Sequence, residues 1–122
     1  MRRVSGLSLI VVTDDPQRCH AALSIAAASA ALGERARVYL HADAVVLAAA
    51  PESPDDARYT ANGLPTLREL LGEALALGVR LTVCQSGLAL AGIDAISLDP
   101  RIETGGLVSF LGGLGEDRLT TV

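Results

Sequence analysis

Runs of apolar residues alternate along the chain with amphipathic segments, and glycines, prolines and acidic residues separate the two kinds. Uninterrupted aliphatic runs are typical of strands buried on both faces of a parallel sheet, whereas apolar positions spaced i, i+3, i+4 and i+7 indicate helices. The pattern predicts strands at residues 7–13, 36–40, 79–84 and 117–122. It predicts helices at residues 16–32, 65–78, 86–92 and 106–114. This alternation predicts an α/β fold built on a parallel sheet.

Residues at the ends of the predicted helices support these boundaries. Asp15 can accept from the free N–H groups of the first helix, and Pro16 suits its first position because the missing N–H would be unpaired there. Gly33 and Gly78 are expected to end the two longest helices in the left-handed conformation. Asp43 is expected to cap a short helical turn after the second strand.

Two segments show no regular spacing of apolar residues. Residues 51–65 contain three prolines among acidic and amide side chains, which indicates an exposed loop and not a domain boundary. Residues 94–106 are expected to be irregular and to include one brief strand. The chain of 122 residues is long enough to bury an ordinary core, and we expect a single domain over residues 1–122.

Composition narrows the function. Half of the residues are hydrophobic but only one Phe and two Tyr are present, so the core must consist of Ala, Leu, Val and Ile. A formal net charge of −4 and few aromatic residues argue against direct binding of nucleic acid. No apolar run approaches the roughly 20 residues of a membrane-spanning helix, and acidic residues stand where a signal peptide would need its cleavage site. We therefore expect a cytoplasmic protein without membrane contact.

Cys84 is the candidate reactive residue. It directly follows the third predicted strand and precedes a glycine-containing short helix. In an open α/β sheet, reactive groups gather at the carboxyl ends of the strands, and N–H groups at a helix start favour a thiolate over a thiol. A lowered pKa would make this sulfur a nucleophile. The structural alternative is that Cys84 is a small buried hydrophobic residue, which is common for free cysteines.

Other cysteine chemistries fit the flanking residues less well. The sequence "CQSG" has no second cysteine for a dithiol cycle, and Leu90 stands where a cysteine phosphatase would have an arginine. The histidine base of a cysteine hydrolase would have to be His20 or His41, both near predicted strand ends. Cys19 is expected to be a buried thiol on the first helix. The cysteine spacing suggests neither a disulfide framework nor a metal site, and no cofactor is expected.

The order of four segments gives a family resemblance over nearly the whole chain. The segments "LSLIVVT", "VYLHADAVVLA", "LTVCQSGLALAGI" and "ETGGLVSFLGGLGEDRLTTV" resemble the DsrE/DsrF/TusD family of small sulfur-relay proteins. The matching features are Cys84 with Gly92 and Ile93, the turn at residues 43–45, and the closing residues 116–122.

The resemblance implies a three-layer, flavodoxin-like fold with a five-stranded parallel sheet and helices on both faces. It also implies that Cys84 carries sulfane sulfur as a persulfide between a donor and an acceptor protein. Because the chain is rich in aliphatic residues and related proteins form trimers and hexamers, a homotrimer or homohexamer is expected. The alternative hypothesis is a non-enzymatic oligomeric or small-ligand-binding module of the same fold, in which Cys84 is structural.

Overall fold

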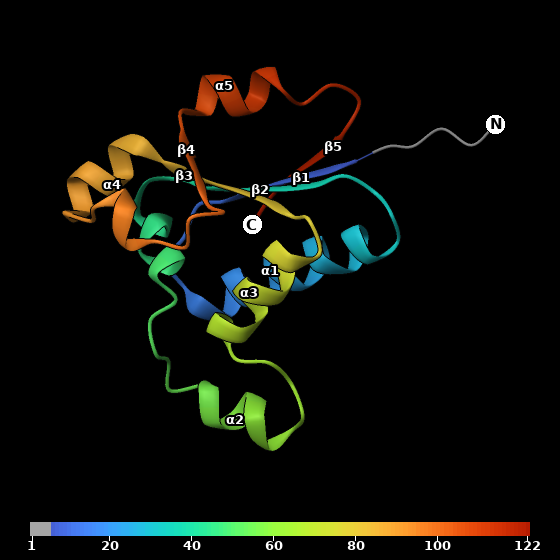
Figure 1. The fold of residues 1–122 in the computed structure, drawn as a ribbon, viewed down its shortest axis with the longest axis vertical. Helices are drawn as coiled ribbons and strands as arrows, with labels where there is room; N and C mark the ends of the chain where they lie inside the picture. Colours follow the sequence, from blue (N-terminus) through green and yellow to red (C-terminus); the bar gives the residue numbers. More distant parts are fainter. Residues whose placement is uncertain (1–5) are drawn as a thin grey trace.

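The computed structural model describes residues 6–122, which form a five-stranded sheet with helices on both faces (Figure 1). All neighbouring strands are parallel, in the order β4-β3-β2-β1-β5. The strands are β1 (Leu7–Val11), β2 (Ala36–Leu40), β3 (Arg80–Cys84), β4 (Glu103–Gly105) and β5 (Arg118–Thr121). The predicted α/β class is confirmed, and the brief strand expected within residues 94–106 is β4.

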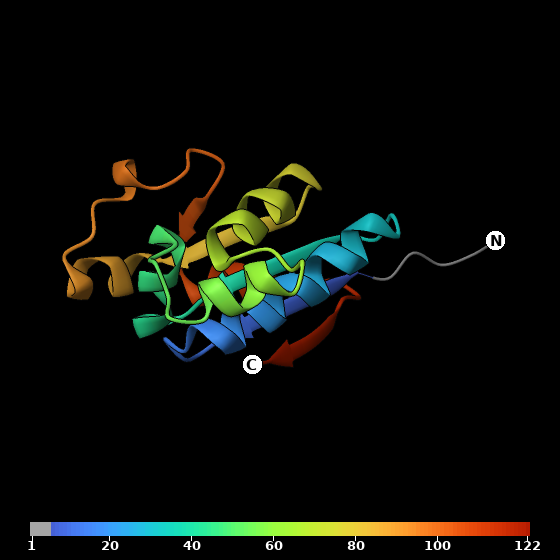
Figure 2. The same cartoon turned by 90° about the horizontal axis from the view of Figure 1, so that it is seen from below.

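The helices are distributed over the two faces according to the direction in which the chain crosses the sheet. From β1 to β4, each new strand is added on the same side of the previous one. The chain then crosses back over the sheet, and β5 pairs with the other side of β1. Because crossovers between parallel strands are right-handed, this reversal puts the last helix on the opposite face. Figures 1 and 2 show α1 (Pro16–Ala31) and α3 (Leu67–Ala76) together on one face, whereas α5 (Leu107–Gly112) lies on the other.

The predicted signals at the helix ends are present. Asp15 accepts a hydrogen bond of 2.9 Å from the Gln17 N–H, and Pro16 is the first residue of α1. At the start of α3, Thr66 and Glu69 form a reciprocal capping box that the sequence analysis did not single out. The glycines that follow these two helices have φ values of 84° at residue 33 and 93° at residue 78, as expected of left-handed stops.

The segment after β2 differs from the prediction. It forms a 3₁₀ helix, η1 (Ala42–Ala49), whose capping residue is His41, and no side chain caps it. The expectation that Asp43 caps a helical turn is therefore wrong, because the helix starts one residue before it. Asp43 lies in the first turn, where a carboxylate still complements the helix dipole.

The predicted loop at residues 51–65 contains a short helix, α2 (Asp56–Ala61), with no buried residue. A turn precedes it, in which the Ser53 N–H donates to Asp56 Oδ2 and the Asp56 N–H donates to the Ser53 carbonyl. The His20 ring stacks on Tyr59 with centroids 4.1 Å apart, and His20 Nε2 lies 2.8 Å from the Pro65 carbonyl oxygen. The segment is thus exposed as predicted, but it is partly helical and attached to α1.

The main core lies between the sheet and the α1/α3 layer. Alternate strand residues point into it and are almost completely buried: Leu9, Val11, Val38, Leu40, Leu81 and Val83. The side chains between them, which include Ser8, Arg37 and Tyr39, point toward the α5 layer, as the strand register requires.

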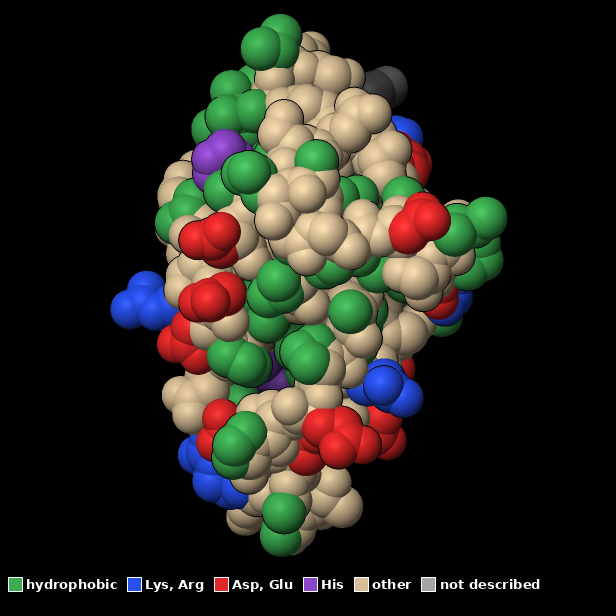
Figure 3. All heavy atoms as spheres, turned by 90° about the vertical axis from the view of Figure 1, so that its left-hand side faces the viewer, with side chains coloured by type: hydrophobic (Ala, Val, Ile, Leu, Met, Phe, Trp, Pro, Cys, Tyr) green, Lys and Arg blue, Asp and Glu red, His purple; other side chains and the backbone are tan. Residues whose placement is uncertain are grey.

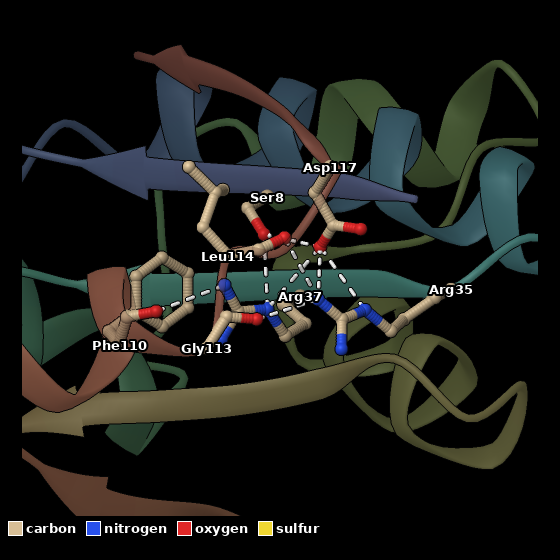
Figure 4. A network of polar contacts seen from close by, with 7 residues as sticks. All are labelled: Ser8, Arg35, Arg37, Phe110, Gly113, Leu114 and Asp117. Carbon is tan, nitrogen blue, oxygen red and sulfur yellow. Dashed lines mark hydrogen bonds and ion pairs between the residues drawn. The ribbon is translucent and has the colours of Figure 1, made fainter. Parts of the chain in front are cut away.

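A polar network holds α5 and the following loop against the sheet (Figure 4). Arg37 donates 3.0 Å hydrogen bonds to Ser8 Oγ and to the Phe110 carbonyl. Asp117 accepts at 2.9 Å from Ser8 and at 2.7 Å from Arg35. Burial alone would raise the pKa of Asp117, but the hydrogen bonds from Arg35 and Ser8 hold it below its ordinary value. The network fixes Phe110, whose ring lies 5.1 Å from that of Tyr39 next to the candidate site.

Candidate functional site

Cys84 occupies the corner between β3 and α4 (Gln85–Ala91). It is both the last residue of the strand and the N-cap of the helix, with an extended backbone at φ −62° and ψ 117°. Its side chain is 8% exposed, and its Sγ atom accepts a hydrogen bond of 3.3 Å from the Gly87 N–H. The predicted position at the carboxyl end of a parallel strand is therefore correct.

Close packing between α4 and η1 creates the surroundings of the sulfur. A Cβ atom on Gly87 would lie 2.5 Å from the Ala42 carbonyl oxygen and 2.8 Å from a methyl of Val45. Ala42 itself has a φ of 51°, in the left-handed region that costs a residue with a Cβ about 1–2 kcal/mol. Backbone strain of this kind is concentrated at functional sites, and here it lies at the residue that faces Gly87.

The pKa of the Cys84 thiol is lowered from its ordinary value. Burial opposes ionisation, but it is outweighed by the nearby Tyr39 hydroxyl and by the backbone N–H groups of Ala42, Gly87 and Ser86. Since α4 has only seven residues, these local donors matter more than the dipole of the whole helix. A thiolate stabilised in this way is the nucleophilic form of cysteine.

Tyr39 is the site residue that sequence reasoning missed. It is completely buried, and its pKa is raised by burial and further by the neighbouring Cys84. Its Oη atom nevertheless makes no hydrogen bond of acceptable geometry with any residue in the range 6–122. We therefore regard the hydroxyl as a neighbour of the sulfur and not as a formed hydrogen-bond partner. The available signal was a tyrosine within a predicted strand, whose register places it on the Cys84 face.

The two histidines differ in their relation to this site. His41 directly follows β2, and its ring centroid lies 6.1 Å from that of Tyr39. Its Nδ1 atom is buried and has no hydrogen-bond partner among the described residues. His20 instead stacks on Tyr59 and contacts the Pro65 carbonyl. Of the two histidines, His41 is therefore the one that lies beside the residues around Cys84.

Cys19 has the character of a structural thiol. It is 1% exposed within the hydrophobic core, as the sequence analysis expected. Burial raises its pKa to about 12, so that it is protonated at neutral pH. Both cysteines are free in the structure. The two thiols thus lie in opposite electrostatic environments, and only Cys84 has donors arranged around its sulfur.

A cleft of about 220 Å³ lies between α5 and the β3–β4 edge. Arg37, Arg80 and Glu103 line it, together with Thr82 and Gly105. Gly105 pairs with Cys84 in the sheet, but Cys84 itself does not line the cleft. Both arginines are already paired, Arg80 with Glu103 at 3.0 Å and Arg37 within the α5 network. The cleft therefore presents few free charges to a ligand.

The surface beyond the carboxyl edge of the sheet is apolar in part. Figure 3 views the molecule from the α4 side and shows hydrophobic side chains scattered between acidic ones. Leu90 on α4 and Ile96 on the 3₁₀ turn η2 (Ala95–Ser97) are 85% and 88% exposed. Within residues 6–122, no helix is long and apolar enough to cross a membrane, and no cluster of three or more His, Cys, Asp or Glu side chains could hold a metal.

Comparison with solved structures agrees with this topology. The crystal structure of the ychN protein from E. coli superimposes with a TM-score of 0.69 at 18% sequence identity, and the match covers 96% of this chain and 99% of that one. At this identity the likeness establishes the fold alone. A search of curated proteins found no match.

The family model agrees with the segments singled out in the sequence. The model of the DsrE/DsrF-like family matches residues 8–116, which include the strand that ends in Cys84, the helix that follows it and the start of the closing segment. The matched region covers most of the chain, and the chain therefore belongs to the DsrE/DsrF-like family.

Proposed function

We propose that this protein is a small sulfur carrier, in which Cys84 receives sulfane sulfur as a persulfide and passes it to a partner protein. The observation that carries the proposal is the set of backbone donors around one sulfur: the Gly87 N–H at 3.3 Å and the N–H groups of Ala42 and Ser86, with the Tyr39 hydroxyl close by. Such a set favours a thiolate, which persulfide chemistry requires. Membership of a family that includes sulfur-relay proteins supports the same conclusion.

The transfer requires no external oxidant or reductant. The Cys84 thiolate attacks the outer sulfur of a donor persulfide, a new sulfur–sulfur bond forms at Cys84, and the donor cysteine leaves as a thiolate with the electron pair of the broken bond. The proton of the transferred sulfur either stays on it or passes to solvent. An acceptor thiolate then attacks this outer sulfur in the same way, and Cys84 leaves as a thiolate. Because the cycle needs free thiols, we propose that the protein works in a reducing compartment, the cytoplasm.

Mass spectrometry of the intact protein tests the proposal. After treatment with a small-molecule persulfide donor, the wild type should gain one sulfur atom. Cys84→Ser should gain none, whereas Cys19→Ser should load like the wild type because Cys19 is buried and protonated. A wild-type protein that never gains sulfur, or a Cys84→Ser variant that still gains it, would mean that the role of Cys84 is structural. The chain would then be a non-enzymatic module of this fold.

We further propose that the protein assembles with copies of itself, as a trimer or a pair of trimers. On the sheet face that carries α5, Val12 beside β5 and Leu119 within it are 50% and 43% exposed, and every residue of β5 is exposed. Val108 and Leu111 on α5 add further exposed apolar surface. Light scattering should give a mass of three or six chains. A mass near 12.5 kDa across micromolar concentrations would overturn this assembly.

A further inference from the structure

The Tyr39 hydroxyl takes no part in the bond changes of the transfer cycle, although it helps to lower the pKa of the Cys84 thiol. The side chain is 0% exposed, and its Oη atom finds no hydrogen-bond partner among residues 6–122. An unpaired polar atom that is shielded from water is unfavourable, so its presence in a folded protein requires an explanation. The second tyrosine, Tyr59, differs because it stacks on His20 near the surface.

Strand register places this hydroxyl next to the sulfur. Tyr39 pairs with Thr82 across β2 and β3, and Cys84 lies two residues beyond Thr82 on the same face of the sheet. Residues in this diagonal relationship are within reach of a long aromatic side chain. The rings of Phe110 and His41 pack near the Tyr39 ring, with centroids 5.1 Å and 6.1 Å away. The hydroxyl is therefore fixed by packing beside Cys84.

The reduced thiol leaves this donor without a well-formed hydrogen bond. Cys84 Sγ already accepts a hydrogen bond from the Gly87 N–H, whereas Tyr39 Oη, although near enough to lower the pKa of the thiol, makes no hydrogen bond of acceptable geometry with any described residue. A persulfide adds a second sulfur atom beyond Sγ, and this terminal sulfur is the more readily ionised of the two. A buried terminal sulfur anion would need a donor of its own, because charge away from water requires hydrogen bonding.

We propose that Tyr39 Oη is the binding group for the terminal sulfur of the Cys84 persulfide, to which it donates its proton in a hydrogen bond. The inference rests on the proposed function and names the residue that would retain the transferred atom. The ligand class is a polarisable sulfur anion bonded covalently to Cys84. Burial and the neighbouring sulfur raise the pKa of Tyr39, which keeps its hydroxyl protonated and able to donate at neutral pH.

The substitution Tyr39→Phe tests this role because it removes one oxygen atom and keeps the ring beside Phe110 and His41. Tyr59→Phe is the matched control, with the same chemical change at the other tyrosine. Each protein is loaded with glutathione persulfide, the donor is removed, and the remaining persulfide is followed by intact mass spectrometry. Tyr39→Phe should lose its sulfur roughly tenfold faster than the wild type, the change expected for one hydrogen bond to a charged group. Tyr59→Phe should behave like the wild type.

The outcomes separate the two proposals. A wild type that does not load overturns the proposed function, and this inference with it. A wild type that loads, together with a Tyr39→Phe variant that retains sulfur equally long, overturns only the role of Tyr39.

A second measurement does not depend on the folding of Tyr39→Phe. In the Tyr59→Phe protein, Tyr39 is the single tyrosine, and fluorotyrosine can be incorporated there alone. Loading should shift its fluorine NMR signal, and an unchanged signal would contradict the contact.

Discussion

Gly87 in α4 lies directly against the carbonyl group of Ala42, so close that a Cβ atom at residue 87 would stand 2.5 Å from that oxygen. The contact joins the two segments that follow neighbouring strands, and both segments contribute N–H groups to the surroundings of Cys84. The sulfur site therefore depends on a position at which no side chain fits.

Gly87→Ala should both destabilise the protein and impair the thiolate. The added methyl group meets backbone and not a flexible side chain, so α4 must move away from η1. We expect a loss of about 1–3 kcal/mol in the free energy of unfolding, typical of overpacking, and a rise in the pKa of Cys84. Denaturant unfolding and the pH dependence of alkylation measure the two effects.

Gly72→Ala provides the control for this substitution. Gly72 lies within α3, and a Cβ atom there meets nothing within 4 Å. The same chemical change should stabilise the protein by about 0.5–1 kcal/mol because alanine is the better helix former. If Gly87→Ala were also stabilising, the close contact between α4 and η1 would not exist in solution.

Ala42→Gly should stabilise the fold without changing the reactivity of Cys84. The φ of 51° at residue 42 is strained for alanine but not for glycine. After allowance for the greater flexibility of glycine in the unfolded chain, we expect a gain of up to about 1 kcal/mol. The variant Ala50→Gly should relieve the same backbone strain at a position away from the sulfur, because φ at residue 50 is 48°. Thermal unfolding should show similar gains for both variants, and a changed alkylation rate in Ala42→Gly would mean that its methyl group helps to form the site.

The two cysteines should separate in a pH titration of alkylation. Because the pKa of Cys84 lies below its ordinary value of 9.0, its thiolate should form, and react, at a lower pH than the thiol of a model peptide. Cys19, with a pKa of about 12, should stay unreactive until the protein unfolds. Peptide mapping after treatment with iodoacetamide at several pH values distinguishes them. Equal rates at neutral pH would contradict the assignment.

The ionisation of Cys84 also has a consequence for stability. A group whose pKa is lower in the folded state stabilises the fold above its unfolded pKa, and this contribution disappears as the pH falls through the folded value. Cys84→Ser should therefore lose stability relative to the wild type at alkaline pH, with a smaller difference under acidic conditions. Unfolding measured on both sides of pH 9 tests this, and a difference that does not vary with pH would contradict the lowered pKa.

Asp117 should be a determinant of acid stability. Its side chain is 6% exposed, and its Oδ2 atom accepts from Ser8 and Arg35 beside the buried Arg37. Because its folded pKa lies below 3.8, its contribution is complete above that pH and is lost as the pH falls through the lowered value. Asp117→Asn should cost about 3–5 kcal/mol, since it leaves Arg37 buried without its counter-charge.

The surface pair between Arg80 and Glu103 is the comparison for the buried network. Its side chains are 60% and 50% exposed, and exposed pairs contribute about 0–1 kcal/mol. Glu103→Gln should therefore unfold nearly like the wild type at every pH. If Asp117→Asn behaved in the same way, the network beneath α5 would contribute no more than a surface pair.

The sequence by itself determined the elements and the place of the nucleophile. Residues 36–40 form a strand in which every residue is buried. Asp15 and Thr66 begin α1 and α3, and the glycines after these helices end them, through local hydrogen bonds and backbone conformation. These are properties of neighbouring residues. For the same reason the corner between β3 and α4 at Cys84 could be located before any tertiary contact was known.

Only the tertiary structure decided what surrounds that sulfur. Tyr39 and Ala42 are more than 40 residues from Cys84 in the chain, and their proximity depends on the pairing of β2 with β3 and on the packing of η1 against α4. The attachment of the helix within residues 51–65 to α1 likewise depends on the stacking of Tyr59 on His20, which are 39 residues apart. Such relations arise from strand register and packing between distant segments, which local periodicity does not encode.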